Sequence, residues 1–141
     1  MKLPDAAPQR LKEMLAEASK LKIDTAAYAA ALRDWATHGK RSRYALSPAE
    51  VVRRSAPRSK QVSLAAAHFE LGQHLHRAGQ VEAARPLFRE SHRLQPDNWT
   101  YKRQAWSLVD ALQGPTPHYD GDWLSDVRAI GAENYYPKLD L

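Results

Sequence analysis

The 141-residue chain contains no cysteine, and this absence excludes more chemistry than any other feature of its composition. Structural disulfides, thiolate metal sites and catalysis by a cysteine nucleophile all require that residue. Long apolar runs are also missing. No stretch approaches the ~20 apolar residues that a membrane-spanning helix needs, and the first residues lack the apolar segment of a signal peptide. We therefore expect a soluble cytoplasmic protein with no membrane partner.

Sequence motifs for catalysis are absent as well. There is no glycine-rich phosphate loop, no G-x-S-x-G nucleophile elbow and no H-E-x-x-H zinc motif. Several histidines occur close together, but His74 does not share the helical face of His68 and His76, and no carboxylate completes a His-x3-His pair. We expect no enzyme activity, no metal and no cofactor.

Helical periodicity runs along most of the sequence. The hydrophobic content of 43% is ordinary for a folded protein, and 141 residues are enough for one domain. Apolar spacing and capping residues such as Asp24 and Ser47 predict helices over 5–22, 25–38, 47–55, 60–78, 98–112 and 123–130. We expect an all-α domain of about six or seven helices, built around one central helical hairpin.

Four segments make up this domain. Residues 1–39 are expected to form an N-terminal helical hairpin, 40–60 a basic linker with a short helix, 61–113 the central hairpin with a capping helix, and 114–141 an acidic and aromatic tail. The tail contains too many apolar side chains, Trp123 and Tyr135 among them, to remain solvated. We expect it to pack back on the helices, with its acidic groups neutralising part of the basic linker.

Residues 65–98 carry a spaced set of packing residues. At the spacing L-G-x2-Y…A-x3-F…P, within a ~34-residue period, the chain has Leu71-Gly72, Leu75, Ala84, Phe88 and Pro96. This pattern resembles the tetratricopeptide repeat family. The resemblance implies a hairpin of two antiparallel helices and a protein-binding function. His68, Leu75 and Ser91 depart from the residues most usual in that family.

Each matched position has a physical reason in the packing of two helices. Gly72 lacks a side chain, so the neighbouring helix can approach its backbone, and Ala84 is small enough to lie against it. Phe88 follows Ala84 at i+4 on the same face. Gly79 is predicted to end the first helix in a left-handed conformation, and Asp97 to cap the helix that follows the hairpin. The apolar residues predicted to join the seam are Leu71, Leu75, Val81, Leu87 and Leu94.

A longer set of segments, residues 43–48, 67–72, 95–101 and 133–137, resembles the carboxyl-terminal extension of some actinobacterial thioredoxin-like proteins of the peroxiredoxin family. The redox domain and every cysteine are missing here. The resemblance therefore implies an accessory or self-associating helical protein related to redox proteins, without thiol peroxidase or disulfide chemistry.

The first candidate site is the face of the first repeat helix opposite its packing seam. In related chaperone-binding repeats, Lys, Asn and Arg clamp a terminal carboxylate, and only Gln73 and Arg103 approximate that set. We predict an adaptor that binds a protein or peptide partner, and the alternative is that the chain's own tail covers these side chains. The predicted partner-binding residues are Phe69, Gln73, His76, Arg77, Trp99 and Arg103.

The second candidate is the basic linker, where seven lysines and arginines face only Glu50, against a net charge of −3 for residues 114–141. Three interpretations remain open: contact with nucleic acid, which would be salt-sensitive, attraction to an acidic protein, and a solvated surface paired with the tail. The residues concerned are Arg41, Arg43, Arg53, Arg54 and Arg58.

A third candidate is aromatic. Trp99, Arg103 and Trp106 share a helical face at i, i+4 and i+7, and a cation stacked on an exposed indole contributes ~0.5–1 kcal/mol. Either the tail or a partner covers this face. A fragment with few repeats also leaves an apolar end that needs cover, so a homo-oligomer is a further alternative.

Overall fold

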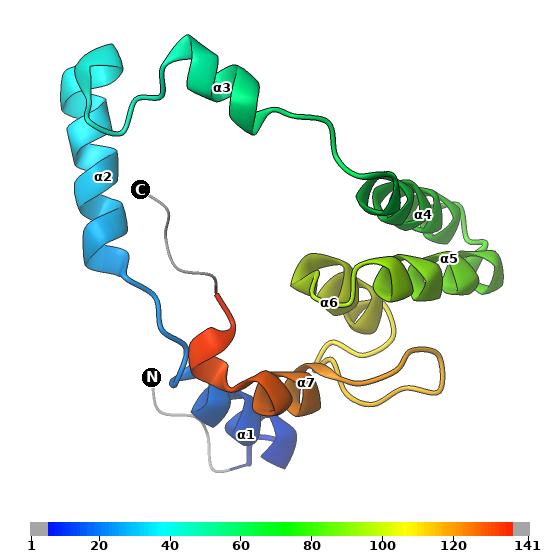
Figure 1. Cartoon of the computed structure of the whole chain (residues 1–141). Coiled ribbons are helices and arrows are strands. Elements are labelled where there is room, and N and C mark those ends of the chain that lie inside the picture. The colour runs from blue at the N-terminus through cyan, green and yellow to red at the C-terminus, as the bar shows by residue number, and fades with distance from the viewer. Residues whose placement is uncertain (1–5, 137–141) are drawn as a thin grey trace.

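The structure is a computed structural model that describes residues 6–136, and within that range the chain is all α with no strand. Figure 1 shows the helices following one another around an open ring. The all-α prediction is therefore confirmed. None of these helices combines the length and the hydropathy needed to cross a membrane. The elements are α1 (Gln9–Ala18), α2 (Thr25–His38), the 3-10 helix η1 (Gly39–Arg41), α3 (Pro48–Arg54), α4 (Lys60–Arg77), α5 (Val81–Leu94), α6 (Trp99–Ser107), α7 (Trp123–Ile130) and η2 (Ala132–Asn134).

Side-chain caps begin several of the helices where the sequence predicted them. The Asp24 carboxylate accepts a hydrogen bond from the Ala27 amide at 2.9 Å, which satisfies a backbone donor that the first turn of α2 leaves unpaired. The Ser47 and Ser59 hydroxyls cap α3 and α4 in the same way, each at 3.2 Å. These local bonds fix where α2, α3 and α4 begin.

α6 differs from its prediction at both ends. Asn98, not Asp97, caps it, by accepting a hydrogen bond from the Tyr101 amide at 3.2 Å. The helix ends at Ser107 rather than at residue 112. Just beyond it, the Asp110 carboxylate accepts hydrogen bonds from two following backbone amides at 3.0 and 2.9 Å. Such a side-chain turn competes with continued helix, and here it replaces the last predicted turn.

α4 and α5 form the predicted hairpin. Gly79 adopts a φ of +78° in the turn between them, as predicted. A Cβ built on Gly72 would lie 3.1–3.3 Å from three ring atoms of Phe88, so the glycine is where the second helix approaches most closely. Ala84 is fully buried, and the three atoms nearest to that Cβ all belong to Phe88. The close approach of α5 at Gly72 is therefore confirmed, and Phe88 makes its nearest contact.

One residue predicted for the seam lies outside it. The buried face of α4 consists of Ala65, Phe69 and Gly72. Leu71 precedes Gly72 by one residue, or about 100° around the helix, and it is 49% exposed. Its predicted burial is wrong. The other apolar residues predicted for the seam are buried or half-buried, namely Leu75, Val81, Leu87 and Leu94.

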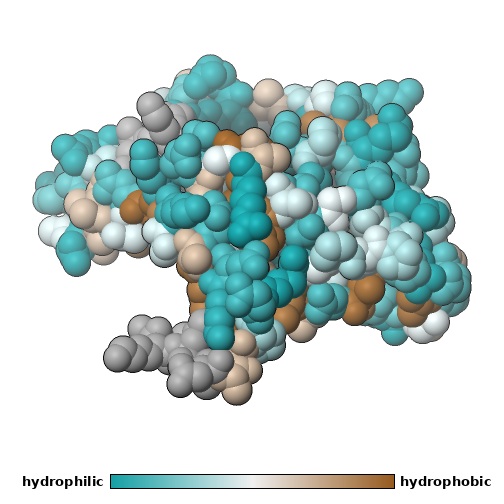
Figure 2. All heavy atoms as spheres, turned by 90° about the horizontal axis from the view of Figure 1, so that it is seen from below, coloured by the Kyte–Doolittle hydropathy of each residue, from teal (hydrophilic) through white to brown (hydrophobic). Residues whose placement is uncertain are grey.

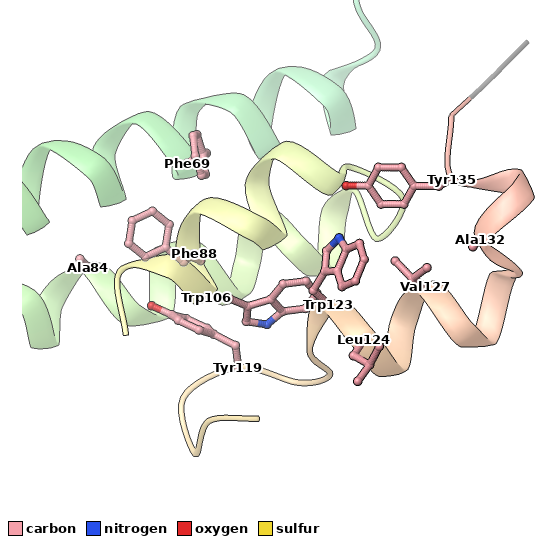
Figure 3. Packing of buried hydrophobic residues seen from close by; sticks show 11 residues of the cluster. Phe69, Ala84, Phe88, Trp106, Tyr119, Trp123, Leu124, Val127, Ala132 and Tyr135 are labelled. Atoms are coloured by element: carbon pink, nitrogen blue, oxygen red, sulfur yellow. The ribbon is translucent and has the colours of Figure 1, made fainter. Parts of the chain in front are cut away.

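The C-terminal segment completes the core, as the sequence predicted (Figure 3). Tyr119, in the loop before α7, meets the Phe88 ring edge-on with centroids 6.2 Å apart. Trp106 of α6 is fully buried beside them. Apolar burial contributes roughly 25 cal/mol per Å². Burial of this cluster is therefore the main contribution that keeps the C-terminal segment packed on the helices. Its members from that segment are Tyr119, Trp123, Leu124, Val127, Ala132 and Tyr135.

Arg10 of α1 connects the beginning of the described chain to its end. The Arg10 Nε donates to the Leu112 carbonyl at 3.0 Å, and an Nη donates to the Gln113 carbonyl at 2.6 Å and to the Asp122 carboxylate at 2.7 Å. Burial acts to raise the pKa of Asp122, but hydrogen bonds from Arg10 and Ser125 outweigh it and lower that pKa below its usual value. Asp122 also caps α7.

α1 packs against α7 and not against α2. Glu13 and Glu17 lie 3.1 and 3.7 Å from Arg128 of α7, and Met14 packs against the core cluster. In Figure 1, α2 leads away from α1. The hairpin predicted for residues 1–39 is therefore wrong, because α7 offers α1 the ion pairs of Arg128 and a place at the edge of the buried core.

α2, η1 and α3 form an arm on the far side of the ring from α5 (Figure 1). α2 contacts η1, and the Ser42 hydroxyl closes that end by donating to the Asp34 carboxylate at 2.5 Å. Every residue from 51 to 60 is exposed. The arm therefore gains little of its stability from the core.

Candidate partner-binding groove

A groove of about 1290 Å³ lies between the start of α4, the α5–α6 connection, α6 and the segment after η2. Among the lining residues that the structure describes, only Asp97 and Arg103 carry a charge. Uncharged polar side chains dominate the rest. Six of them are carboxamides: Gln61, Gln73, Gln95, Asn98, Gln104 and Gln113.

Two of these carboxamides hold the walls of the groove together. Gln73 of α4 donates a hydrogen bond to Gln104 of α6, and Gln61 donates to the Leu94 carbonyl at the end of α5 at 2.7 Å. Gln73 also accepts a hydrogen bond from Arg77 at 3.1 Å. Each carboxamide has two N–H donors and an oxygen with two acceptor sites. The side chains therefore retain hydrogen-bonding capacity beyond the bonds that they make within the chain.

Arg103 is the one cation that residues 6–136 contribute to the lining. Its Nε donates to the Gln113 side-chain oxygen at 3.2 Å, and its Nη1 donates to the Tyr135 hydroxyl at 3.3 Å. A guanidinium has five N–H donors in a fixed planar arrangement. Arg103 is exposed, and these two bonds orient its side chain without using all of its donors.

Trp99 forms an aromatic wall with the C-terminal segment. Its ring centroid lies 4.7 Å from that of Tyr135. The cation near the indoles is Lys102, whose Nζ lies 5.5 Å from the Trp99 centroid and 5.8 Å from the Trp106 centroid. The predicted stacking of Arg103 on these rings is therefore wrong. Lys102, at i+3 from Trp99 and i−4 from Trp106, occupies the surface between them.

Comparison with known proteins gives this geometry no name. No family model, curated protein or solved structure matches the chain. The resemblances to the tetratricopeptide repeat and to the extension of thioredoxin-like proteins remain predictions from residue patterns.

The structure divides the six predicted partner-binding residues between three environments. Phe69 is 4% exposed and stacks on the Tyr101 ring with centroids 4.3 Å apart, so its predicted partner contact is wrong. It lies on the face of α4 that the rest of the fold covers. His76 and Arg77 lie outside the groove lining, and Arg77 is linked to it only through Gln73. The three that line the groove are Gln73, Trp99 and Arg103.

Sequence reasoning missed most of the carboxamide set. Gln95 and Asn98 are the only near neighbours in it, and they share a hydrogen bond of 3.3 Å. The other members come from separate segments and follow no helical period. Their shared environment depends on the position of α6 against α4, which the sequence pattern did not predict.

The five arginines predicted to contact nucleic acid or an acidic partner are exposed on the arm. Arg43 lies over the Tyr44 ring, with its guanidinium carbon 4.6 Å from the centroid. Arg53 and Arg54 both donate to Glu50, and these hydrogen bonds lower the pKa of Glu50 to about 2. Part of the positive charge of the linker is therefore balanced within α3 itself.

The carboxylates of the C-terminal segment pair elsewhere than predicted. Asp122 pairs with Arg10, and Asp126 pairs with Lys102 at 2.7 Å. Neither cation belongs to the basic linker, so the predicted neutralisation is wrong for these two groups. The packing of the segment against α1 and α6 brings them to other partners. Residues 137–141, which the same prediction included, lie outside the described residues.

A smaller hollow of about 650 Å³ contains His92, Lys102 and Asp126. His92 donates a hydrogen bond from Nε2 to the Tyr101 carbonyl at 3.3 Å, and burial lowers its pKa. Its ring centroid lies 5.5 Å from that of Tyr119. Within residues 6–136, no three His, Cys, Asp or Glu side chains are placed to hold a metal ion together.

Proposed function

We propose that this chain is a protein-interaction module that binds an extended peptide segment of a partner in the carboxamide-lined groove. The observation that carries the proposal is the gathering of six carboxamides and one arginine along a single open groove. The main chain of an extended peptide presents an N–H donor and a C=O acceptor at each residue. A carboxamide side chain pairs with either group.

The groove chemistry defines the class of peptide. The described part of the chain contributes only Asp97 and Arg103 as charged lining residues, so the groove favours a segment of low net charge. Arg103 has donors for one carboxylate or carbonyl of the ligand. Val62, Leu108 and Tyr136 provide apolar surface for a side chain of the peptide. The preferred ligand is therefore an extended segment of low net charge that carries one acidic or strongly accepting group.

The tetratricopeptide resemblance of residues 65–98 supports the same function. In that family the first helix of the hairpin supplies peptide contacts, and Gln73 is such a position that also lines the groove. The resemblance adds weight to protein binding but does not specify the ligand.

Selection from a phage-displayed library of short linear peptides tests the proposal. Enriched peptides should bind the unaltered protein, and Arg103→Ala or Gln104→Ala should weaken them about ten-fold, the loss of one good hydrogen bond. His74→Ala changes an exposed residue of α4 outside the groove and serves as the matched control. Failure to enrich any sequence, or peptides that bind all three variants with unchanged affinity, would contradict the proposal.

The arm supports a second candidate, binding of nucleic acid, because Arg41, Arg43 and Arg58 are exposed on it. Fluorescence anisotropy with a labelled random-sequence DNA duplex at low and high salt tests this candidate. Phosphate contacts predict affinity that falls steeply with salt and that is lost when the three arginines are replaced by alanine. No binding at low salt would eliminate it.

A further inference from the structure

α2 carries an apolar face that the described part of the chain leaves uncovered. Tyr28, Leu32 and Trp35 recur at i, i+4 and i+7 and so lie on one side of the helix. They are 52%, 48% and 59% exposed. Ala31 is the one buried residue of α2. Three large apolar side chains on one helix are thus left in solvent.

The outer face of α4 is a second surface of this kind. Leu64 and Leu71 lie two turns apart and are 41% and 49% exposed. His68 lies between them on the same stripe and is half-buried. Leu71 is the residue whose burial was predicted from the packing pattern and does not occur. This face of α4 therefore lacks a covering helix.

The architecture keeps these two surfaces apart within one chain. α2 and α4 lie on opposite sides of the ring in Figure 1. Residues 19–24 connect α2 to α1 and reach about 20 Å when fully extended. α1 is itself held in place by the hydrogen bonds of Arg10 to Leu112 and Asp122 and by the ion pair of Glu13 with Arg128 of α7. α2 is therefore tethered to the side of the molecule away from the outer face of α4.

We propose that two copies of the chain cover these surfaces for each other. The Tyr28, Leu32 and Trp35 face of α2 in one copy packs on the Leu64 and Leu71 face of α4 in the other, and the reverse contact forms by symmetry. This inference concerns surfaces separate from the groove and does not depend on the proposed peptide binding.

The exposed area fits a weak, reversible interface. An aromatic side chain buries about 150–250 Å², so the half-exposed Tyr28 and Trp35, together with Leu32, offer on the order of 300 Å² per α2 face. The two half-exposed leucines of α4 offer about half of that area. Two reciprocal contacts therefore bury on the order of 900 Å², which is the size of a weak, transient interface.

Charge does not oppose the contact. α2 contains one Arg and one Asp, Arg33 and Asp34, and α4 contains Lys60, Arg77 and Glu70. The two helices are therefore nearly neutral, whereas pairing one arm with another through residues 40–60 would bring two strongly basic segments together. The α4 of a second copy is thus a better occupant for the α2 face than the basic residues 40–60 of that copy.

Sedimentation equilibrium of the full chain over a range of concentrations tests the proposal. The unaltered protein should show a monomer–dimer equilibrium, and Trp35→Glu or Leu71→Glu should each raise the dimer dissociation constant at least about ten-fold. Val52→Glu is the control, because Val52 of α3 is 73% exposed and belongs to neither surface. Far-UV circular dichroism verifies that each variant keeps its helices.

Mixing the variants tests the reciprocal arrangement. A Trp35→Glu copy keeps an intact α4 face and a Leu71→Glu copy keeps an intact α2 face, so the mixture should form heterodimers at concentrations where each variant alone is monomeric. The proposal is overturned if the unaltered protein stays monomeric throughout the range. It is also overturned if Leu71→Glu dimerises like the unaltered protein, or if the mixture forms no heterodimer.

Discussion

Gly72→Ala tests the helix contact on which the hairpin depends. Gly72 lies in the interior of α4, and an alanine Cβ there would approach three atoms of the Phe88 ring to 3.1–3.3 Å, closer than the ordinary contact range of 3.4–4 Å. The ring has little room to move. Phe88 is fully buried, with Phe69 edge-on at 5.7 Å and Tyr119 edge-on at 6.2 Å.

Two opposing terms set the expected change in the free energy of unfolding. Alanine is favoured over glycine in a helix interior by about 1 kcal/mol. Overpacking a well-packed core costs about 1–3 kcal/mol. Because Phe88 is enclosed by its neighbours, we expect the second term to be larger and Gly72→Ala to destabilise the protein by about 1 kcal/mol. In a Phe88→Leu background the crowding is absent, so the same change should stabilise by about 1 kcal/mol.

Urea unfolding followed by circular dichroism measures both values as a double-mutant cycle. Ala67→Gly, at an exposed position of the same helix, calibrates the propensity term and should destabilise by about 1 kcal/mol. If Gly72→Ala stabilises the protein by about as much as Ala67→Gly destabilises it, the close contact with Phe88 is refuted. It is refuted equally if the effects of Gly72→Ala and Phe88→Leu on the free energy of unfolding are simply additive.

Three further predictions concern the ends of the chain and its pH response. Arg10→Ala should lower the free energy of unfolding by about 2–3 kcal/mol, because two carbonyls and a carboxylate lose their donor. The control Lys22→Ala, at an exposed position, should change it by less than about 0.5 kcal/mol. Equal urea midpoints for the two variants would contradict the Arg10 contacts. Burial lowers the pKa of His92 in the folded state below 6.5, so stability should fall as pH drops from 6.5 toward that folded value, and His92→Gln should remove this slope. Asp122 has a folded pKa below 3.8, so the stability that its carboxylate contributes is present above pH 3.8 and is lost as pH falls through the folded value. Asp122→Asn should therefore lose less stability than the unaltered protein over that acid range. An acid profile that the substitution leaves unchanged would contradict the assignment.

Local signals in the sequence predicted the bounds of α2 and α7, but α1 (Gln9–Ala18) is shorter than the predicted 5–22, and α6 ends before the predicted residue 112. Asp24 and Gly39 bound α2 because a cap and a left-handed glycine act within one turn of the residues they terminate. The Gly72 contact was also predictable, since few residues allow such a close approach. The choice of Phe88 as its partner depended on the crossing of the two helices, which spacing along one helix does not determine.

Long-range pairing was the main limit on prediction. Arg10 and Asp122 are 112 residues apart, and nothing near either one indicates the other. The partner of α1 was therefore misassigned to the adjacent α2. The groove was only partly predicted for the same reason: Gln73 and Arg103 came from a repeat pattern, but the other carboxamides meet only through the position of α6.

The central claim is that a peptide binds along α4, α6 and the segment after η2, and backbone amide NMR mapping with a selected peptide tests it most directly. The account predicts that shifts cluster at Gln73, Asn98, Gln104 and Tyr136, and that Arg103→Ala weakens the titration. Shifts confined to the arm, or scattered over the surface without saturation, would contradict it. Figure 2 shows a face on which hydrophilic residues dominate and hydrophobic ones are scattered. Non-specific apolar adsorption to that face should therefore produce scattered amide shift changes and not clustered ones.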